Sequence, residues 1–435
     1  MRNKSLLVLV LLLITLQSYA QDTLLISQAT ITEKIQSGNT QLLIKQQEYE
    51  AAKGDHQQSN AVWLPSVSVS HTAMFTTNPL MAFGSKLNQE ILTQSDFNPA
   101  LLNDPDQTKN FATKIEVLQP IINVDGMYGR QAAKAKMDAF ALQAERTQEY
   151  LEFEAVKAYM QLQLAYKAVA VLEEAQQTVN ANLKLINDYN NQGLVQVTDV
   201  LSVKVRAKEV QNQLQYAKSN VQNASDYLSY LMGEATNVIY KPETMIEGTV
   251  TFFDANTSLS ENRKDIQAMD LSTEAYKSMM KSGKTGMLPR LNAFGSYELY
   301  DDHLFQTGAQ GYTVGAQLSW DVFDGYKTLG KSKKAKAEYE KAVLETEAYK
   351  AKSQLELNKV NRQLQDAENQ VQLAKQSWEE STEAYRILHN RFEEGLEKTT
   401  DLLHTETQMI QKELAYLQAV FEYNTTKAYI QFLTK

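Results

Sequence analysis

Histidine, cysteine and paired acids are the side chains that most often perform catalysis or hold metals. Paired acids such as Glu379-Glu380 and Glu393-Glu394 do occur here, but they lie in charge-rich segments typical of solvated helix faces. The chain has no cysteine, which excludes disulfides, thiolate nucleophiles and cysteine-ligated metals. Its histidines show no metal-ligand spacing, since they stand at positions 56, 71, 303, 389 and 404. No glycine-rich phosphate loop follows a predicted strand, and no nucleophile motif occurs. The sequence therefore favours neither an enzyme nor a resident cofactor or metal.

The charge balance restricts the partners. The formal net charge is -9, and no basic cluster stands out against it. Because nucleic-acid binding depends on basic surfaces that neutralise phosphates, nucleic acid is not an expected partner.

The N-terminus has the organisation of a secretory signal peptide, expected at residues 1–20. Arg2 and Lys4 precede an apolar run from Leu6 to Leu16, and Ser18-Tyr19-Ala20 forms a small-x-small cleavage site. A membrane anchor would need about 20 apolar residues. No other stretch approaches that length, so a mature chain that crosses a membrane must do so with strands closed into a barrel.

The chain carries an internal duplication. Gly193-Leu194, followed by Thr198-Asp199, recurs 202 positions later as Gly395-Leu396, followed by Thr400-Asp401. We therefore expect a first structural repeat over 21–233, a linker over 234–260 and a second repeat over 261–435. Tandem copies of one plan favour an extended architecture, and hence a duct or scaffold rather than a compact enzyme.

Each repeat should contain a long helical hairpin, because no proline occurs between 121 and 241 or after 289. Long helices are expected at 126–190 and 331–392, each on the order of 90 to 100 Å long. Heptad spacing in the second of them predicts packing against other helices. The remaining expected parts are hairpin tips at 191–198 and 393–399, return helices at 197–232 and 399–433, and leading helices at about 23–60 and 261–284.

Between the helices the apolar period changes to two, which predicts strands at about 64–75, 111–122, 288–300 and 312–322. Apolar residues on one face would meet lipid, and polar residues on the other a wet lumen. Trp63, Trp320 and Tyr312 lie near predicted strand ends, where membrane-interface aromatics gather. A soluble half-buried sheet would show the same alternation.

Four strands cannot close a barrel, since the smallest closed barrels have about eight. Two copies would give a barrel filled by side chains, whereas three would give twelve strands and room for a pore. The loops at the strand tips, a long one over 76–110 and a short one over 301–311, both suit the extracellular side.

The segments 193–200, 119–126 and 320–325, with Thr198-Asp199 and the two Asp-Gly junctions, resemble the TolC family of outer-membrane efflux proteins. The likeness extends over essentially the whole mature chain. It implies a mainly α fold with a β-barrel contribution: tandem-duplicated antiparallel helical hairpins that form a coiled-coil tunnel, and four transmembrane β-strands per chain that complete a 12-stranded barrel in a homotrimer. It further implies an outer-membrane location with a periplasmic helical extension, small-molecule efflux, outer-membrane lipid contacts, and two partners, a periplasmic adaptor (membrane fusion) protein and an inner-membrane pump.

The resemblance also implies roles for residues at the tips. Gly193, Leu194, Gly395 and Leu396 would dock the adaptor, and at the simplest level both glycines would end helices in a left-handed conformation. Asp401 would form a threefold acidic ring in a periplasmic gate.

Four further tip residues bear on the gate. Thr198 and Asp199 would tie neighbouring hairpins together in the closed state. The chain departs from the best-known member of that family at Glu397, where that member has an Arg, and at His404, where it has a second ring Asp. Lys398 or Arg391 could replace the missing Arg, and the imidazole of His404 would make closure pH-sensitive.

Two alternatives remain open on sequence grounds. One is a type I secretion duct that exports proteins, because the pump selects the cargo. The other is a periplasmic coiled-coil scaffold that never enters lipid and uses its strands to oligomerise. Heat-modifiable trimers that fractionate with outer-membrane barrels would distinguish a channel from this scaffold.

Overall fold

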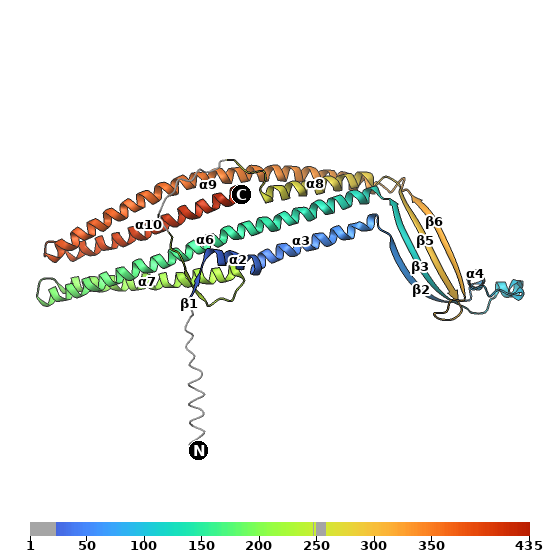
Figure 1. Cartoon of the computed structure of the whole chain (residues 1–435), viewed down its shortest axis with the longest axis horizontal. Helices are drawn as coiled ribbons and strands as arrows, with labels where there is room; N and C mark the ends of the chain where they lie inside the picture. The colour runs from blue at the N-terminus through green and yellow to red at the C-terminus, as the bar shows by residue number, and fades with distance from the viewer. Residues whose placement is uncertain (1–22, 247, 249–257) are drawn as a thin grey trace, which may run out of the picture. The chain divides into compact units, whose positions relative to one another are not determined.

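Two long helical hairpins dominate the structure, a computed structural model that describes residues 23–246, 248 and 258–435. The expected signal peptide lies outside the described residues. Helix α6 (Val124–Asn191) returns as α7 (Val197–Met232), and α9 (Lys327–Glu393) returns as α10 (Thr399–Thr434) (Figure 1). The long antiparallel hairpins predicted from the proline-free stretches are thus confirmed.

The chain divides into two compact units that cut across these helices. The first comprises Met1–Gln46, Gln143–Lys264 and Tyr349–Lys435, and holds both hairpin tips. The second comprises Gln47–Leu142 and Asp265–Ala348, and holds the larger sheet.

Apolar side chains repeating along the helices form the core of the first unit. One cluster joins the two hairpins near their tips, with Val179 and Ile186 of α6, Val203 of α7 and Leu402 of α10 buried. A second cluster lies along α9 and α10, where Leu357 and other members of the heptad stripe are buried. The predicted heptad seam is therefore a packing seam.

The start of the first repeat is more divided than the single helix expected over about 23–60. Strand β1 (Thr23–Ile26) comes first, followed by α2 (Gln28–Gly38) and α3 (Thr40–Gln58). The break falls at Asn39, whose side-chain amide donates to the carbonyl oxygen of Leu231 at 2.7 Å. Its side-chain oxygen accepts from the backbone N–H of Leu42 at 3.1 Å, which caps the next helix.

A short parallel strand pair lies in the first unit. Strand β4 (Ile239–Pro242), which lies within the segment expected to be a linker, pairs with β1. Such four-residue strands depend on a partner distant in sequence, which explains why periodicity did not reveal them.

The four predicted strands are confirmed and form one antiparallel sheet of order β2-β3-β5-β6 in the second unit. Their bounds are β2 (Ser66–Thr76), β3 (Thr108–Ile122), β5 (Arg290–Asp301) and β6 (Ala309–Ser319). Helix α8 (Lys264–Thr285) precedes β5, and the 3-10 helix η1 (Ser59–Val62) precedes β2. Strands β2 and β6 are the edges.

The register gives this sheet two chemically different faces. Register pairs such as Val69–Ile115, Ile115–Tyr297 and Tyr297–Tyr312 place successive apolar residues on one face. Pairs on the other face include Ser68–Glu116 and Lys114–Glu298, and the latter is also an ion pair at 3.9 Å. The alternation predicted for the strands around Ile115 and Val314 is thus a property of the assembled sheet.

The segment expected to be a long loop over 76–110 contains helices. These are α4 (Pro79–Asn88), the 3-10 helix η2 (Gln94–Phe97) and α5 (Pro99–Asn103). Asn78 and Asn98 cap α4 and α5, each with a proline in the first turn. The Asn-Pro pairs that suggested a loop are therefore helix-start signals.

Helices in the described part of the chain lack the combination of length and apolar character that crossing a bilayer requires.

Candidate functional site at the hairpin tips

Both hairpin tips are built on the same turn. After α6, the N–H of Gly193 donates to the Asn190 carbonyl at 3.0 Å, and the N–H of Leu194 donates to the Tyr189 carbonyl at 2.9 Å. Gly193 has a φ of 76°. These bonds define a Schellman motif, in which a left-handed residue satisfies the last carbonyls of a helix.

The second tip repeats this geometry. The N–H of Gly395 donates to the Phe392 carbonyl at 2.9 Å, and the N–H of Leu396 donates to the Arg391 carbonyl at 2.9 Å. Gly395 has a φ of 73°. The duplicated Gly-Leu pair therefore encodes a duplicated backbone turn.

Each turn exposes a leucine. Leu194 retains 67% of its surface and Leu396 retains 66%. Exposed leucines on a turn held by its own hydrogen bonds form a surface able to contact another molecule.

The two tips contact each other within one chain. The hydroxyl of Tyr189 donates to the carbonyl of Glu393 at 2.9 Å, and the Tyr189 and Phe392 rings lie 6.1 Å apart. The hairpins are therefore coupled at their ends.

The expected gate residues occupy the first turns of the return helices. The Asp199 carboxylate accepts from the N–H of Gln196 at 3.0 Å in a capping box, and Thr198 is exposed one position before it. Asp401 and His404 are both exposed and one helical turn apart on α10. The structure thus brings Asp401 and His404 onto one face, whereas Asp199 is engaged at its own helix start.

The departure from the family pattern at Glu397 has a local consequence. The Arg391 guanidinium Nε lies 2.8 Å from the Glu397 carboxylate. This ion pair closes the second tip from within, so Arg391 is already paired inside its own chain.

A buried polar cluster lies above the tips. Glu406 of α10 is 0% exposed, and its carboxylate lies 3.5 Å from the Arg206 guanidinium of α7. The Asn182 side chain of α6 donates to the same carboxylate at 3.4 Å. The cluster joins three helices of the two hairpins.

Burial governs the chemistry of this cluster. Removal from water raises the pKa of Glu406 above its ordinary value, although Arg206 and Asn182 act in the opposite direction. The Arg206 guanidinium also contacts Glu209 at 3.4 Å. A buried pair with such long contacts is weak evidence for stability, because the cost of removing both charges from water offsets their attraction.

The tip motifs do not predict this cluster, yet the sequence carries a signal for it. Arg206 interrupts the apolar stripe formed by Val203 and Val210 on α7, and Glu406 interrupts the stripe formed by Leu402 and Ile410 on α10. Polar residues at core positions of paired stripes indicate a buried interaction between helices.

Of the expected interface aromatics, Trp63 and Trp320 lie next to strand ends, whereas Tyr312 lies inside a strand. Trp63 follows η1, and the Arg130 guanidinium lies 4.8 Å from the centre of its ring. Trp320 lies one residue beyond β6, and its indole N–H donates to the carbonyl of Met287 at 3.0 Å. Tyr312 lies within β6 and is 80% exposed. The observed strand, Ala309–Ser319, therefore begins and ends three residues before the predicted 312–322.

A cluster of acids and a histidine stands at the tip of β5. Metal-ligand atoms of Asp301, Asp302 and His303 come within 4.8 Å of one another. The Asp301 carboxylate, however, accepts from the N–H groups of His303 at 2.9 Å and Gly308 at 2.8 Å. Its oxygens therefore hold the turn between β5 and β6.

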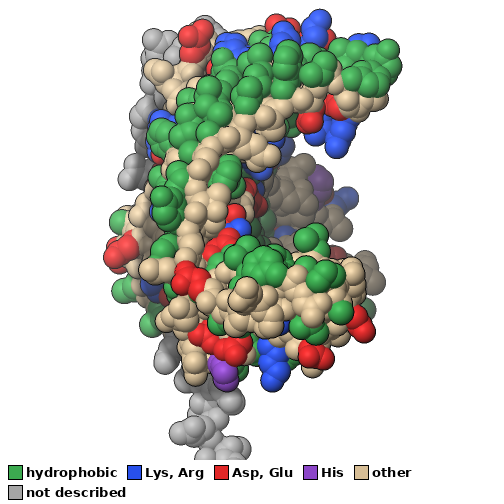
Figure 2. Space-filling model, turned by 90° about the vertical axis from the view of Figure 1, so that its right-hand side faces the viewer, with side chains coloured by type: hydrophobic (Ala, Val, Ile, Leu, Met, Phe, Trp, Pro, Cys, Tyr) green, Lys and Arg blue, Asp and Glu red, His purple; other side chains and the backbone are tan. Residues whose placement is uncertain are grey.

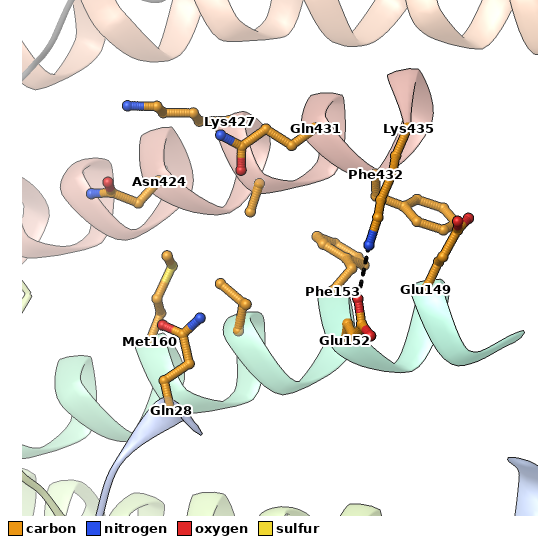
Figure 3. A pocket seen from close by; sticks show the side chains of 12 residues that line it. Gln28, Glu149, Glu152, Phe153, Met160, Asn424, Lys427, Gln431, Phe432 and Lys435 are labelled. Atoms are coloured by element: carbon orange, nitrogen blue, oxygen red, sulfur yellow. Dashed lines mark hydrogen bonds and ion pairs between the residues drawn. The ribbon is translucent and has the colours of Figure 1, made fainter. Parts of the chain in front are cut away.

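A cleft of about 420 Å³ lies between α6 and α10 in the first unit (Figure 3). Phe153, Met160 and Phe432 supply its apolar wall. The Lys435 ammonium pairs with the Glu152 carboxylate at 3.0 Å. Within the cleft, these two opposite charges therefore bind each other.

Comparison with known proteins gives this architecture a class. The chain has the fold of outer-membrane channels. It superposes on CusC with a TM-score of 0.81 at 12% identity, with 96% of this chain and 95% of that chain covered. The outer membrane protein VceC from Vibrio cholerae gives 0.78 at 18%, with 94% and 96% covered. The CmeC outer membrane channel of Campylobacter jejuni gives 0.79 at 16%, with 94% and 85% covered.

A family model adds evidence from sequence. Residues 257–434 match the outer membrane efflux protein family. No curated protein matches the chain. The resemblance to outer-membrane efflux proteins is thereby confirmed, and the similar proteins are channels rather than enzymes.

Proposed function

We propose that this protein is a trimeric outer-membrane channel that forms the exit duct of a tripartite efflux system. Small molecules delivered by an inner-membrane pump would cross the periplasm and outer membrane through it. The observation that supports this proposal most strongly is the four-stranded sheet, with one apolar face, one polar face and two edge strands.

Such a sheet requires partners if it enters lipid. The outer edges of β2 and β6 carry backbone groups that no strand pairs within the described chain. In a bilayer each unpaired group would cost several kcal/mol, so the sheet must close with other copies. Three copies supply twelve strands, which enclose a water-filled lumen lined by the polar face.

The helices offer a matching surface for other copies. On α7, Leu201, Val205 and Tyr216 are exposed, and on α9, Leu355 and Leu373 are exposed. Leu355 and Leu373 lie five helical turns apart on one face, and Lys359, Arg362 and Asp366 occupy that face between them. These leucines are therefore separate contact points for a neighbouring copy rather than a continuous apolar stripe.

The hairpin tips would serve the partners. Gly193-Leu194 and Gly395-Leu396 form exposed turns suited to contact the periplasmic adaptor, which connects the channel to the pump. The shared turn geometry supports one docking mode for both tips.

Gating would occur at the same end. Three copies of Asp401 would form an acidic ring that binds cations and repels anions. His404 lies one turn further along the exposed face, next to the proposed ring. Thr198 and Asp199 would contact neighbouring hairpins in the closed state.

Conductance of the purified trimer in a planar bilayer tests the proposal. We expect the wild-type trimer to conduct and to be blocked by di- and trivalent cations, and Asp401→Ala to lose that block. Glu422→Ala, an exposed acid elsewhere on α10, is the matched control and should remain blocked. Equal block of Asp401→Ala and wild type would exclude the ring. A chain that stays a water-soluble monomer would overturn the channel assignment itself.

A further inference from the structure

The segment between β2 and β3 folds into a small helical body. The Lys86 ammonium pairs with the Asp96 carboxylate at 2.9 Å, and the Phe83 and Phe97 rings pack edge to face with centres 5.6 Å apart. Asp96 also closes a capping box at the start of η2 with Thr93. These contacts give the segment a defined shape of its own.

Helix α4 is fixed to the end of the sheet through Gln89, which directly follows it. The Gln89 side-chain amide donates to the carbonyl of Lys109 at 2.8 Å, the side-chain oxygen of Asn110 at 2.9 Å and the carbonyl of Asp301 at 3.2 Å. Gln89 is buried. These bonds reach both central strands, β3 and β5.

The contacts place α4 on the polar side of the sheet. Along β3, Asn110 has the same parity as Lys114 and Glu116, which belong to the polar face. On β6, Ala309 aligns with Tyr300, on the same face as Glu298. α4 contacts both β3 and β6, and both Asn110 and Ala309 are buried.

The opposite side of α4 is apolar and exposed. Ala82, Ser85 and Gln89 form its buried side. Leu80 and Leu87 lie about half a turn around the helix from them, and Leu80 retains 81% of its surface. Figure 2 faces this end of the chain and shows hydrophobic side chains exposed on it. The stripe formed by Leu80 and Leu87 carries no charge.

We infer that α4 is a lid at the outer mouth of the channel, and that its apolar stripe packs against the same stripe of the other two copies. This inference rests on the proposed trimer, which turns the polar face of the sheet inward. Three α4 helices seated on that face then project Leu80 and Leu87 toward the threefold axis. Apolar side chains meeting there form a constriction that resists wetting.

The position of α4 argues against lipid as the occupant of the stripe. Lipid would contact the face that carries Val69, Ile115 and Tyr297, whereas α4 is held on the other face through Asn110. The lid therefore belongs to the lumen side, where the proposed trimer would bring together the α4 helices of its three copies.

Site-directed disulfide formation tests the lid directly, because the chain has no cysteine. Leu87→Cys in the full-length trimer, treated with a mild oxidant in detergent, should give a disulfide-linked dimer that reductant removes. Gln94→Cys, exposed on η2 of the same segment, is the matched control and should stay monomeric on denaturing gels. A lysine-reactive cross-linker applied to the same sample reports the trimer independently.

The outcomes separate the two levels of the inference. If lysine cross-linking gives trimers but Leu87→Cys forms no disulfide, the lid is overturned and the channel stands, whereas no trimer would overturn the proposed function. Quenching by brominated lipid of a fluorophore attached to the thiol of the Leu87→Cys variant in vesicles would assign the stripe to lipid instead. Should Leu87→Cys fail to assemble, Leu80→Cys reports on the same stripe. Leu87→Asp should raise single-channel conductance severalfold by wetting and separating the helices, and unchanged conductance would contradict the lid.

Discussion

At the scale of single residues, backbone conformation is the reason that the hairpin tips require glycine, and crowding by neighbouring atoms is not. A Cβ at Gly395 would meet no atom within 4 Å, yet its φ of 73° lies in the left-handed region. An L-residue there costs about 1 to 2 kcal/mol. Glycine is therefore favoured at position 395 because it adopts a positive φ without strain.

We expect Gly395→Ala to destabilise the second hairpin by about 1 to 2 kcal/mol. Gly330→Ala is the matched control, because Gly330 also has open space around it but lies inside α9 with an ordinary helical φ. That substitution should stabilise by about 1 kcal/mol. Chemical denaturation in detergent measures both, and an equal loss of stability in both variants would contradict the explanation by backbone conformation.

Glu406 should make hairpin stability depend on pH. Because burial raises its pKa above the ordinary 4.5, the folded chain holds the proton more tightly than the unfolded chain. The resulting stabilisation is complete below pH 4.5 and is lost as the pH rises through the raised pKa.

Glu406→Gln removes this titration while retaining the side-chain shape. Its Tm should match that of the wild type near pH 4.5 and exceed it increasingly toward neutrality. Thermal unfolding followed by circular dichroism across this range checks the prediction, with exposed Glu422→Gln as control. Parallel pH profiles for wild type and Glu406→Gln would show that Glu406 does not titrate in this way.

At the scale of elements, the two faces of the sheet should differ in whether they tolerate a charged residue. Val314 and Thr313 are neighbours on β6, but Val314 aligns with Gly295 on the apolar face and Thr313 with Ser296 on the polar face. We expect Val314→Arg to cost about 2 to 4 kcal/mol in a bilayer and Thr313→Arg to be tolerated. The yield of heat-modifiable trimer in the outer-membrane fraction measures the difference, and equal yields would contradict a lipid-facing Val314.

The elements also show what the sequence could predict. Periods of 3.5 and 2, with the absence of proline over long stretches, are local properties, so the helical hairpins and the four strands were predictable. The pairing of Thr23–Ile26 with Ile239–Pro242 depends on contacts more than 200 residues apart, and no local pattern carries it. Likewise, the Asn-Pro signals at Asn78 and Asn98 fit both turns and helix starts, and only packing against the sheet tip decides between them.

The candidate site likewise has features that the sequence predicts and features that only the folded chain reveals. Gly193 and Gly395 predict their turns because few other residues accept that backbone. The burial of Glu406 beside Arg206 and Asn182 depends on which faces of three helices turn inward, and a single sequence shows only that polar residues interrupt apolar stripes. The ion pair of Arg391 with Glu397 likewise requires the folded turn.

At the scale of the whole molecule, duplication sets the numbers. Each chain presents two turns of one backbone shape, so an assembly of three chains would display six such turns. The residues that follow Gly-Leu would differ between neighbouring turns. Val195-Gln196 follows the first Gly-Leu pair and the ion-paired Glu397 follows the second. A partner that contacts only the backbone turn would bind with a stoichiometry of six per trimer. A partner that also requires the charge of Glu397 would bind with a stoichiometry of three per trimer.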